Sequence, residues 1–158
     1  MATPHKKTDF DSRLASNRKA FHQYEIIEKM EAGIILTGAE VKSARAKQIN
    51  LKPAYVSIQN GEAFLKKCHI SAYNKATSDT PHEAERDRKL LLNKIQIAHL
   101  DSQLSEHGLT VIPLNAYLKK GKIKIEIGLG RGKKLHDKRQ DLKRKAQTRE
   151  ISRHFRQG

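Results

Sequence analysis

The sequence has very little cysteine and no tryptophan, and these absences exclude several kinds of site. Cys68 is the only cysteine among 158 residues, so the chain cannot form an internal disulfide or a zinc site built from several cysteines. Its eight histidines are scattered and none belongs to an HExxH motif. Aromatic residues make up only 5% of the chain, too few for a surface that stacks many bases. We therefore expect no metal and no other cofactor.

Long apolar runs are also missing. No stretch approaches the roughly 20 apolar residues of a transmembrane helix, and the segment from Met1 to Arg13 lacks the apolar core of a signal peptide. These absences predict a cytoplasmic protein without a membrane partner. Nothing in the sequence requires a second copy of the chain, so we expect a monomer.

Positive charge is what the sequence has in excess. The net charge is +15 and the isoelectric point is near 10.0, as in proteins that bind nucleic acid or an anionic membrane surface. Residues 131–158 hold eleven Lys/Arg and three Asp/Glu, a net charge of +8. This segment has too few apolar residues to offset the entropy lost on ordering. It also lacks the continuous apolar face of a membrane-bound helix, so we predict a mobile tail that becomes helical against phosphates.

The length allows one domain with extensions. We expect a flexible basic arm over residues 1–16, ordered only near Asn17, an RNA-binding domain over residues 17–130, and the basic tail over residues 131–158. The run from Tyr24 to Leu36 is rich in β-branched residues and predicts two strands joined by a tight turn at Glu31-Ala32-Gly33.

Two further motifs predict a helix and a hairpin. Thr37 and Glu40 have the T-x-x-E spacing of a capping box, so a helix should begin there and end near Lys47. Residues 55–59 and 62–66 flank Asn60-Gly61, a dipeptide suited to the positive φ angles of a type I′ turn. In that register Ile58 lies opposite Ala63 and Val56 opposite Leu65. We expect the second strand to extend to Ile70, with Cys68 as a buried, inert thiol.

The second half of the chain predicts a loop, a helix and a last hairpin. Residues 74–88 are polar and aperiodic, which indicates a long loop. Asn93 is a suitable cap for a helix that ends at Gly108. Residues 109–118 and 122–129 form the last hairpin, in which Pro113 indicates an edge or a bulge. About six strands with two or three helices predict a mainly β fold with inserted α, a small antiparallel six-stranded β-barrel of the OB-like kind.

Catalytic motifs are weak. The run from Gly128 to Lys134 lacks the spacing of a phosphate-binding loop and is better interpreted as a flexible exit from the last strand. His136-Asp137 could serve as base and orienting carboxylate in a nuclease, but Asp137 is also well placed to begin a helix. We therefore predict that the chain is not an enzyme.

The most specific pattern is a set of short segments that occur in order from Asn17 onwards: Asn17-Arg18-Lys19-Ala20, Glu31-Ala32-Gly33-Ile34, Thr37-Gly38-Ala39-Glu40-Val41-Lys42-Ser43, Asn60-Gly61-Glu62-Ala63-Phe64-Leu65, Arg88-Lys89-Leu90-Leu91-Leu92-Asn93 and Gly132-Lys133-Lys134-Leu135-His136-Asp137-Lys138-Arg139. In these segments the chain resembles the small protein B family, SmpB, the partner of transfer-messenger RNA in bacterial trans-translation.

The resemblance implies a function and a set of partners. It implies a non-catalytic OB-related barrel that binds the tRNA-like domain of transfer-messenger RNA. The protein would deliver this RNA to stalled ribosomes, together with EF-Tu and GTP that act through the charged RNA. The tail would then enter the decoding centre of the small subunit and the empty mRNA channel.

The resemblance also implies site residues. Those for transfer-messenger RNA are Asn17, Arg18, Lys19, Glu31, Leu91 and Asn93. Three of them have other interpretations: Glu31 as part of a solvated turn, Leu91 as core and Asn93 as a helix cap. Because a carboxylate repels phosphate, Glu31 would accept hydrogen bonds from a base or ribose, or orient a nearby Lys or Arg.

A second set would contact the decoding centre: Gly132, Lys133, Lys134, His136, Asp137, Lys138 and Arg139. In this set His136 would stack on a base, while Lys138 and Arg139 would meet phosphates. Two alternatives stay open from the sequence: a structural ribosomal protein with a basic extension, and an RNA-processing enzyme that uses His136 and Asp137.

Overall fold

The computed structural model describes residues 12–73 and 83–133 of the chain, and the elements named below lie within these ranges. The helices are α2 (Arg18–Gln23), α3 (Gly38–Arg45) and α4 (Lys94–His107). The strands are β1 (Arg13–Ser16), β2 (Tyr24–Ile34), β3 (Ile49–Asn50), β4 (Tyr55–Gln59), β5 (Glu62–Lys66), β6 (His69–Ile70), β7 (Arg88–Leu91), β8 (Thr110–Lys119) and β9 (Lys122–Gly132).

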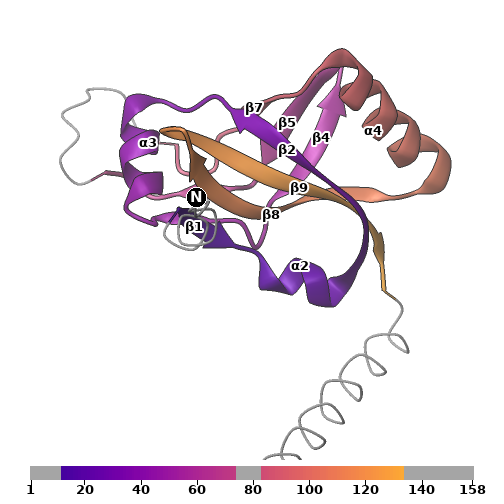
Figure 1. Ribbon diagram of the computed structural model, residues 1–158, viewed down its shortest axis with the longest axis horizontal. Coiled ribbons are helices and arrows are strands. Elements are labelled where there is room, and N and C mark those ends of the chain that lie inside the picture. Colours follow the sequence, from indigo (N-terminus) through magenta and orange to yellow (C-terminus); the bar gives the residue numbers. More distant parts are fainter. Residues whose placement is uncertain (1–11, 74–82, 134–158) are drawn as a thin grey trace, which may run out of the picture.

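Six antiparallel strands close into a ring. The order of hydrogen-bonded neighbours is β8, β4, β5, β7, β2 and β9, and β9 pairs again with β8. Figure 1 shows the long strands β2, β8 and β9 crossing the molecule, with α3 at one side, α4 over the upper end and α2 along the lower edge. The mainly β, six-stranded barrel predicted from the sequence is confirmed, and β3 and β6 form a small separate sheet.

Two of the three predicted hairpins, β4–β5 and β8–β9, are confirmed, and turn residues with positive φ explain their tightness. Asn60 and Gly61 have φ angles of 51° and 74°, and Lys120 and Gly121 have 51° and 76°. Positive φ at both central positions matches the twist of the flanking strands. The expected register is confirmed as well, with Ile58 opposite Ala63 and Val56 opposite Leu65.

The interior of the ring is filled by the inward-facing residues of each strand. The alternating Ile123, Ile125, Ile127 and Leu129 of β9 are between 0 and 8% exposed. Helix α4 adds Leu100, which is fully buried in the same core. The helix begins and ends where expected, because Asn93 caps it in a capping box and Gly108 adopts the left-handed conformation at its end.

The glycines near the end of β9 are part of the sheet, so the flexible exit expected there is wrong. Strand β9 continues to Gly132 and pairs with β2 over this stretch. A Cβ at Gly128 would lie 2.8 Å from Leu114 and 3.2 Å from Ile26. Leu114 and Ile26 belong to a small second core that α2 covers with Ala20. Glycine is needed here because these side chains approach the β9 backbone closely.

Strand β2 is continuous, which corrects the expected turn at Glu31-Ala32-Gly33. It pairs with β9 along most of its length and with β7 at its end, so its backbone is held as a strand through Gly33. A Cβ at Gly33 would lie 3.1 Å from the Cβ of Leu91. This glycine permits close contact with β7 and makes no turn.

Strand β1 begins the ordered body earlier than the expected Asn17. It pairs with the part of β8 that contains Asn115 and Tyr117, whereas β4 pairs with β8 at Val111. Leu14 of β1 is 6% exposed and belongs to the main core. The apolar face of this short strand was too small to identify from the sequence.

The chain turns away from the barrel after β5, so the expected extension of that strand to Ile70 is wrong. Lys67 has a φ of 58°, and His69–Ile70 pairs instead with β3. Cys68 lies between the strands and is buried, as expected. Burial raises the pKa of its thiol to about 12, which keeps it protonated and unreactive near neutral pH.

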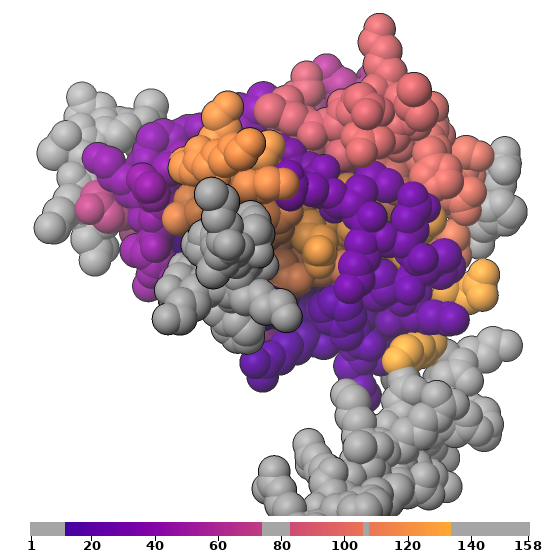
Figure 2. Space-filling model, viewed as in Figure 1, coloured from indigo at the N-terminus to yellow at the C-terminus, as the bar shows by residue number. Residues whose placement is uncertain are grey.

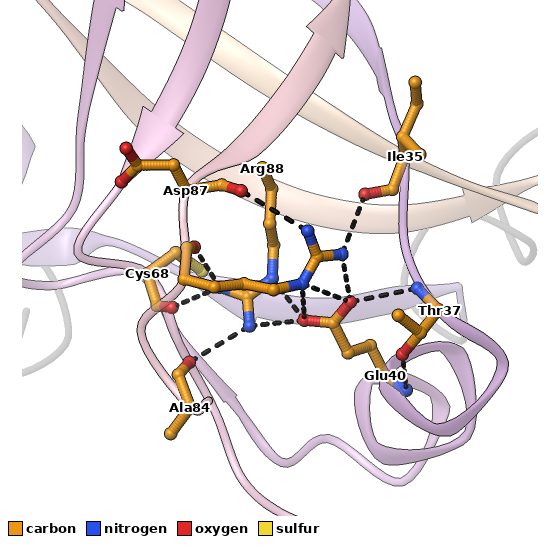
Figure 3. A network of polar contacts seen from close by, with 8 residues as sticks. Ile35, Thr37, Glu40, Cys68, Ala84, Asp87 and Arg88 are labelled. Carbon is orange, nitrogen blue, oxygen red and sulfur yellow. Dashed lines mark hydrogen bonds and ion pairs between the residues drawn. The ribbon is translucent and has the colours of Figure 1, made fainter. Parts of the chain in front are cut away.

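A buried ion-pair network joins α3 to the segment that leads into β7. It includes Arg88, which begins β7 and is not the end of the loop expected over residues 74–88. Figure 3 shows the Glu40 carboxylate between two guanidinium groups. The Nε atom of Arg88 lies 2.6 Å from Glu40, and its Nη1 lies 2.6 Å from the Cys68 carbonyl. Arg86 also donates to Glu40. Arg88 is 0% and Glu40 2% exposed.

The predicted capping box at the start of α3 is confirmed and belongs to this network. The Glu40 carboxylate accepts the Thr37 backbone N–H at 2.9 Å, and the Thr37 hydroxyl accepts the Glu40 N–H at 3.2 Å. Burial alone would raise the pKa of Glu40, but the hydrogen bonds from Arg86, Thr37 and Arg88 outweigh it and leave the pKa below its ordinary value of 4.5.

Replacing Glu40 should be strongly destabilising. Glu40→Ala leaves the buried Arg88 guanidinium without its counter-charge, which costs about 3–5 kcal/mol. Urea unfolding of the full chain would measure this loss. Because the Glu40 pKa is lowered by folding, its stabilisation is complete above pH 4.5 and is lost as the pH falls through the folded value. The difference between wild type and variant should therefore shrink in acid.

The matched control is Glu62→Ala, which removes an exposed ion pair with Lys89 at 3.1 Å. Such pairs contribute at most about 1 kcal/mol. Equal losses for the two variants would contradict the role given to the buried network.

Candidate nucleic-acid interface

Polar side chains from three neighbouring strands gather on one outer surface of the barrel. We call this surface the Glu31 face; it consists of Glu31 from β2, Lys124 and Glu126 from β9, and Asn115, Tyr117 and Lys119 from β8. Figure 2 shows the indigo and violet residues of the N-terminal third beside the orange residues of the last hairpin on one side of the molecule. Glu31 pairs with Glu126, and Glu126 pairs with Asn115, so one row of the face crosses all three strands.

Glu31 is held by two donors that come from β8. The hydroxyl of Tyr117 donates to its carboxylate, and Nζ of Lys119 lies 3.3 Å from both oxygens. The hydrogen bond from Tyr117 is the largest cause that lowers the pKa of Glu31, with Lys119 and Lys124 adding to it. Burial and the same hydrogen bond raise the pKa of Tyr117. Of the two roles considered for Glu31, this geometry supports the orientation of a nearby lysine.

Leu91 borders the same surface. Its backbone pairs with Gly33, two residues beyond Glu31 on the same side of β2. The side chain is 52% exposed, so the interpretation of Leu91 as a core residue is wrong. The register therefore brings Glu31 and Leu91, which are 60 positions apart in the sequence, onto neighbouring strands.

Asn93 caps helix α4, which is the other interpretation considered for this residue. Its Oδ1 accepts the Gln96 N–H at 2.8 Å, and the Gln96 side chain accepts the Asn93 N–H at 3.1 Å. Helix α4 is fixed to β2 by His99, whose Nε2 lies 2.7 Å from Glu28. Asn93 is exposed, so the cap stands beside Leu91 at the edge of the surface.

The first predicted RNA-binding segment divides into one buried and two exposed residues. Asn17 is 2% exposed, and its amide donates to the carbonyls of Pro113 and Leu51 at 2.9 and 3.3 Å. Its Oδ1 accepts the Ala20 N–H and so caps α2. Asn17 thus fixes α2 to the barrel, while Arg18 and Lys19 are exposed on that helix.

Lys19 also lines a cleft of about 280 Å³ between α2, β8 and residues 52–55. Lys52, Tyr24 and Tyr55 lie in the same lining. The cleft combines positive charge with aromatic rings, a composition suited to nucleic acid.

Of the predicted decoding-centre residues, Gly132 and Lys133 are described. Gly132 pairs with Tyr24 at the end of β9, and Lys133 donates its backbone N–H to Gln23 at 2.9 Å. Nζ of Lys133 lies 3.4 Å from the Phe21 carbonyl. The start of the tail is thereby attached to α2. Lys134, His136, Asp137, Lys138 and Arg139 lie outside the described residues.

Lys119 and Lys124, which complete the Glu31 face, were not among the predicted site residues. The signal that could have found Lys124 is the strict alternation of apolar and polar residues over 122–129, which puts Lys124 and Glu126 on one outer face. The contact of Lys119 with Glu31 depends on the register of three strands, which the sequence did not supply.

Among the described residues no group of three His, Cys, Asp or Glu could hold a metal ion. Within the same ranges, no helix has the length and apolar character needed to cross a membrane.

Comparison with known proteins gives consistent similarities. A family model described as SmpB protein matches residues 14–157. The SsrA-binding protein of Thermosynechococcus vestitus is 49% identical over 144 residues, which cover 91% of this chain and 95% of that protein. The SsrA-binding protein of Nostoc punctiforme is 51% identical over 140 residues, with coverages of 89% and 90%.

A solved structure described as "tmRNA-SmpB: a journey to the center of the bacterial ribosome" contains a similar chain. Its TM-score is 0.64 at 40% sequence identity, and the match covers 77% of this chain and 85% of that one.

Replacing Glu31 should reduce discrimination among RNAs. Glu31→Gln removes a negative charge, which strengthens non-specific attraction to phosphate, but it also releases Lys119 and Tyr117 from their fixed positions. We expect affinity for a folded RNA partner to fall by about tenfold, the effect of one charge-assisted hydrogen bond, while affinity for unstructured RNA stays equal or rises. Filter binding at one salt concentration would measure both.

Asp101→Asn is the matched control, because Asp101 is an exposed residue of α4 outside the Glu31 face and loses the same charge. A parallel rise in affinity for both RNAs in Glu31→Gln would contradict the positioning role.

Proposed function

The chain belongs to the SmpB protein family, and from this premise we propose that it binds the tRNA-like domain of transfer-messenger RNA and delivers it to stalled ribosomes for trans-translation. The observation that carries this proposal beyond family membership is the Glu31 face. There the β2, β8 and β9 register brings Glu31, Lys119 and Lys124 together beside Leu91.

The face suits a folded RNA better than an extended strand. Lys119 and Lys124 supply positive charge for phosphates, which gives affinity without regard to sequence. Leu91 offers an exposed apolar surface to an unstacked base. Glu31 holds Lys119 in place, so recognition rests on the spacing of charges along the barrel and hence on the shape of the RNA.

The tail provides the second activity. Lys133 is attached to α2 through Gln23 and Phe21, so the residues that follow leave the barrel from a fixed point. In this proposal His136 stacks on a base of the decoding centre, Lys138 and Arg139 meet phosphates of the small-subunit RNA, and the basic C-terminal residues occupy the empty mRNA channel.

The remaining features of the proposal follow from the same mechanism. The protein acts in the cytoplasm as a monomer, without a cofactor and without catalysing a reaction. EF-Tu and GTP act on it indirectly, through the alanine-charged RNA. Recognition then depends on two RNAs, one bound by the barrel and one by the tail.

Deleting residues 134–158 tests the division between barrel and tail. We expect the truncated protein to bind transfer-messenger RNA within about threefold of the full chain in the presence of competitor RNA, because the competitor cancels the non-specific attraction of the tail. Tagging of peptides on stalled ribosomes in a reconstituted translation reaction should be lost.

Two results would overturn this assignment. Equal loss of binding and tagging would refute the division of labour. Stable incorporation of the full chain into translating ribosomes, together with weak binding to free transfer-messenger RNA, would favour the structural ribosomal protein considered from the sequence.

A further inference from the structure

A cavity of about 250 Å³ opens on the Glu31 face. Its lining consists of Ser12, Arg13, Asn115, Tyr117 and Glu126. Three of these residues come from the β8–β9 hairpin. Arg13 begins β1, which pairs with the same part of β8, and Ser12 directly precedes it and accepts the Leu118 N–H. The cavity is therefore built from paired strands and has a fixed shape.

Glu126 occupies an energetically unfavourable position in this cavity. It lies directly opposite Glu31 in the β2–β9 pairing, and like charges at opposed positions of a sheet destabilise it. Tyr117 and Lys119 bind Glu31, but neither donates to Glu126. The Glu126 carboxylate thus weakens the pairing of β2 with β9, and its side chain lines the cavity.

Glu126 has acceptor positions that its hydrogen bonds within the described residues do not use. Oε1 accepts Nδ2 of Asn115 at 3.0 Å, and this is the hydrogen bond that Glu126 makes within the described ranges. A carboxylate has about four acceptor positions, so both oxygens keep capacity. Asn115 adds its own carbonyl oxygen. Glu126 and Asn115 together present hydrogen-bond acceptors, and Arg13 adds a positive charge to the same lining.

The ring of Tyr117 provides a flat wall that is already fixed. Its hydroxyl donates to Glu31, so binding a ligand costs little side-chain entropy at this residue. Arg13 lies opposite Tyr117 in the β1–β8 pairing and Lys124 in the β8–β9 pairing, so a positive charge stands on each side of this wall. A planar group attached to a phosphate could stack on the Tyr117 ring while its phosphate contacts Lys124.

We propose that this cavity binds one unpaired guanine base of the RNA, with the Glu126 carboxylate accepting hydrogen bonds from the N1–H and the N2 amino group of the base. The proposal rests on the proposed function, since it names a base within the RNA bound by the Glu31 face. Tyr117 stacks on the base, and Lys124 meets a neighbouring phosphate.

The chemistry of the four bases explains the choice of guanine. Its Watson–Crick edge has two adjacent donors, which match the two oxygens of a carboxylate. Adenine and cytosine present one amino donor next to a ring nitrogen that accepts, and that nitrogen would face a carboxylate oxygen. Uracil has one N–H between two carbonyls. Guanine is the only one of the four that fills both oxygens without opposing an acceptor to an acceptor.

The test combines a change in the protein with a change in the RNA. Inosine lacks the N2 amino group of guanosine, so synthetic tRNA-like domains carrying inosine at each unpaired guanosine in turn remove one donor without altering the protein. At one position we expect inosine to weaken binding to the wild-type chain by about tenfold, the usual effect of a bidentate base contact. With the Glu126→Gln variant, the same inosine replacement should weaken RNA binding by less than about twofold.

A second arm separates a guanine within the RNA from a free guanine nucleotide. Titration of the isotope-labelled full chain with guanosine monophosphate, followed by NMR, should shift the amides of Asn115 and Glu126 more strongly than inosine or adenosine monophosphate does. Asp101→Asn should behave as the wild type in both arms.

The outcomes distinguish this inference from the proposed function. Tight RNA binding in which no inosine position depends on Glu126 overturns the guanine site alone. Failure of the wild-type chain to bind the RNA overturns the proposed function, and the nucleotide titration then still tests the cavity. Equal shifts from all the mononucleotides, or shifts remote from Asn115, also overturn the guanine site.

Discussion

The pairing of β9 along both of its edges is the constraint on which the rest of the structure depends. Strand β2 binds one edge from Lys124 to Gly132, and β8 binds the other from Lys122 to Gly130. This double pairing closes the barrel and brings the outward side chains of three strands into one surface. Because side chains alternate along each strand, the same register that buries Ile125 and Ile127 places Lys124 and Glu126 outside. The core and the candidate RNA surface thus follow from one alignment.

Acidic side chains have different surroundings inside the molecule and on the Glu31 face. Inside, Glu40 is surrounded by Arg86, Arg88 and the Thr37 N–H, and these hydrogen bonds offset the cost of removing the groups from water. They join α3 to the start of β7, the strand that ends at Leu91. On the Glu31 face the carboxylates stay partly exposed, where they orient a lysine or remain available to donors of a ligand. Burial therefore separates the acidic residues that stabilise the fold from those of the candidate binding surface.

Much of the architecture could be predicted from the sequence, because its hairpins and helix caps depend on local chemistry. Asn60-Gly61, Thr37 with Glu40, and Asn93 with Gly108 each fix a backbone conformation within a few residues. The errors arose where distant contacts decide the outcome. Gly33 looked like a turn because its close approach to Leu91 comes from another strand, and Arg88 looked like part of a polar loop because its partner Glu40 is 48 positions away.

The candidate site could be predicted only in part for the same reason. Glu31, Leu91 and Asn93 were identified by resemblance, and the register explains why Glu31 and Leu91 are neighbours. The partners of Glu31, Tyr117 and Lys119, become visible only when β2, β9 and β8 are aligned. Local patterns show which face of a strand points outward, but they do not show which strands lie beside it.

The place where the tail leaves the barrel has a mechanical consequence. Lys133 directly follows the strand that is bonded along both edges, and sheet hydrogen bonds run across the strands. Tension applied along β9 would therefore load the bonds to β2 and β8 in shear, many at a time, and would not peel them apart one by one. A pull on the C-terminal segment is in this way transmitted to the whole body as a rigid unit.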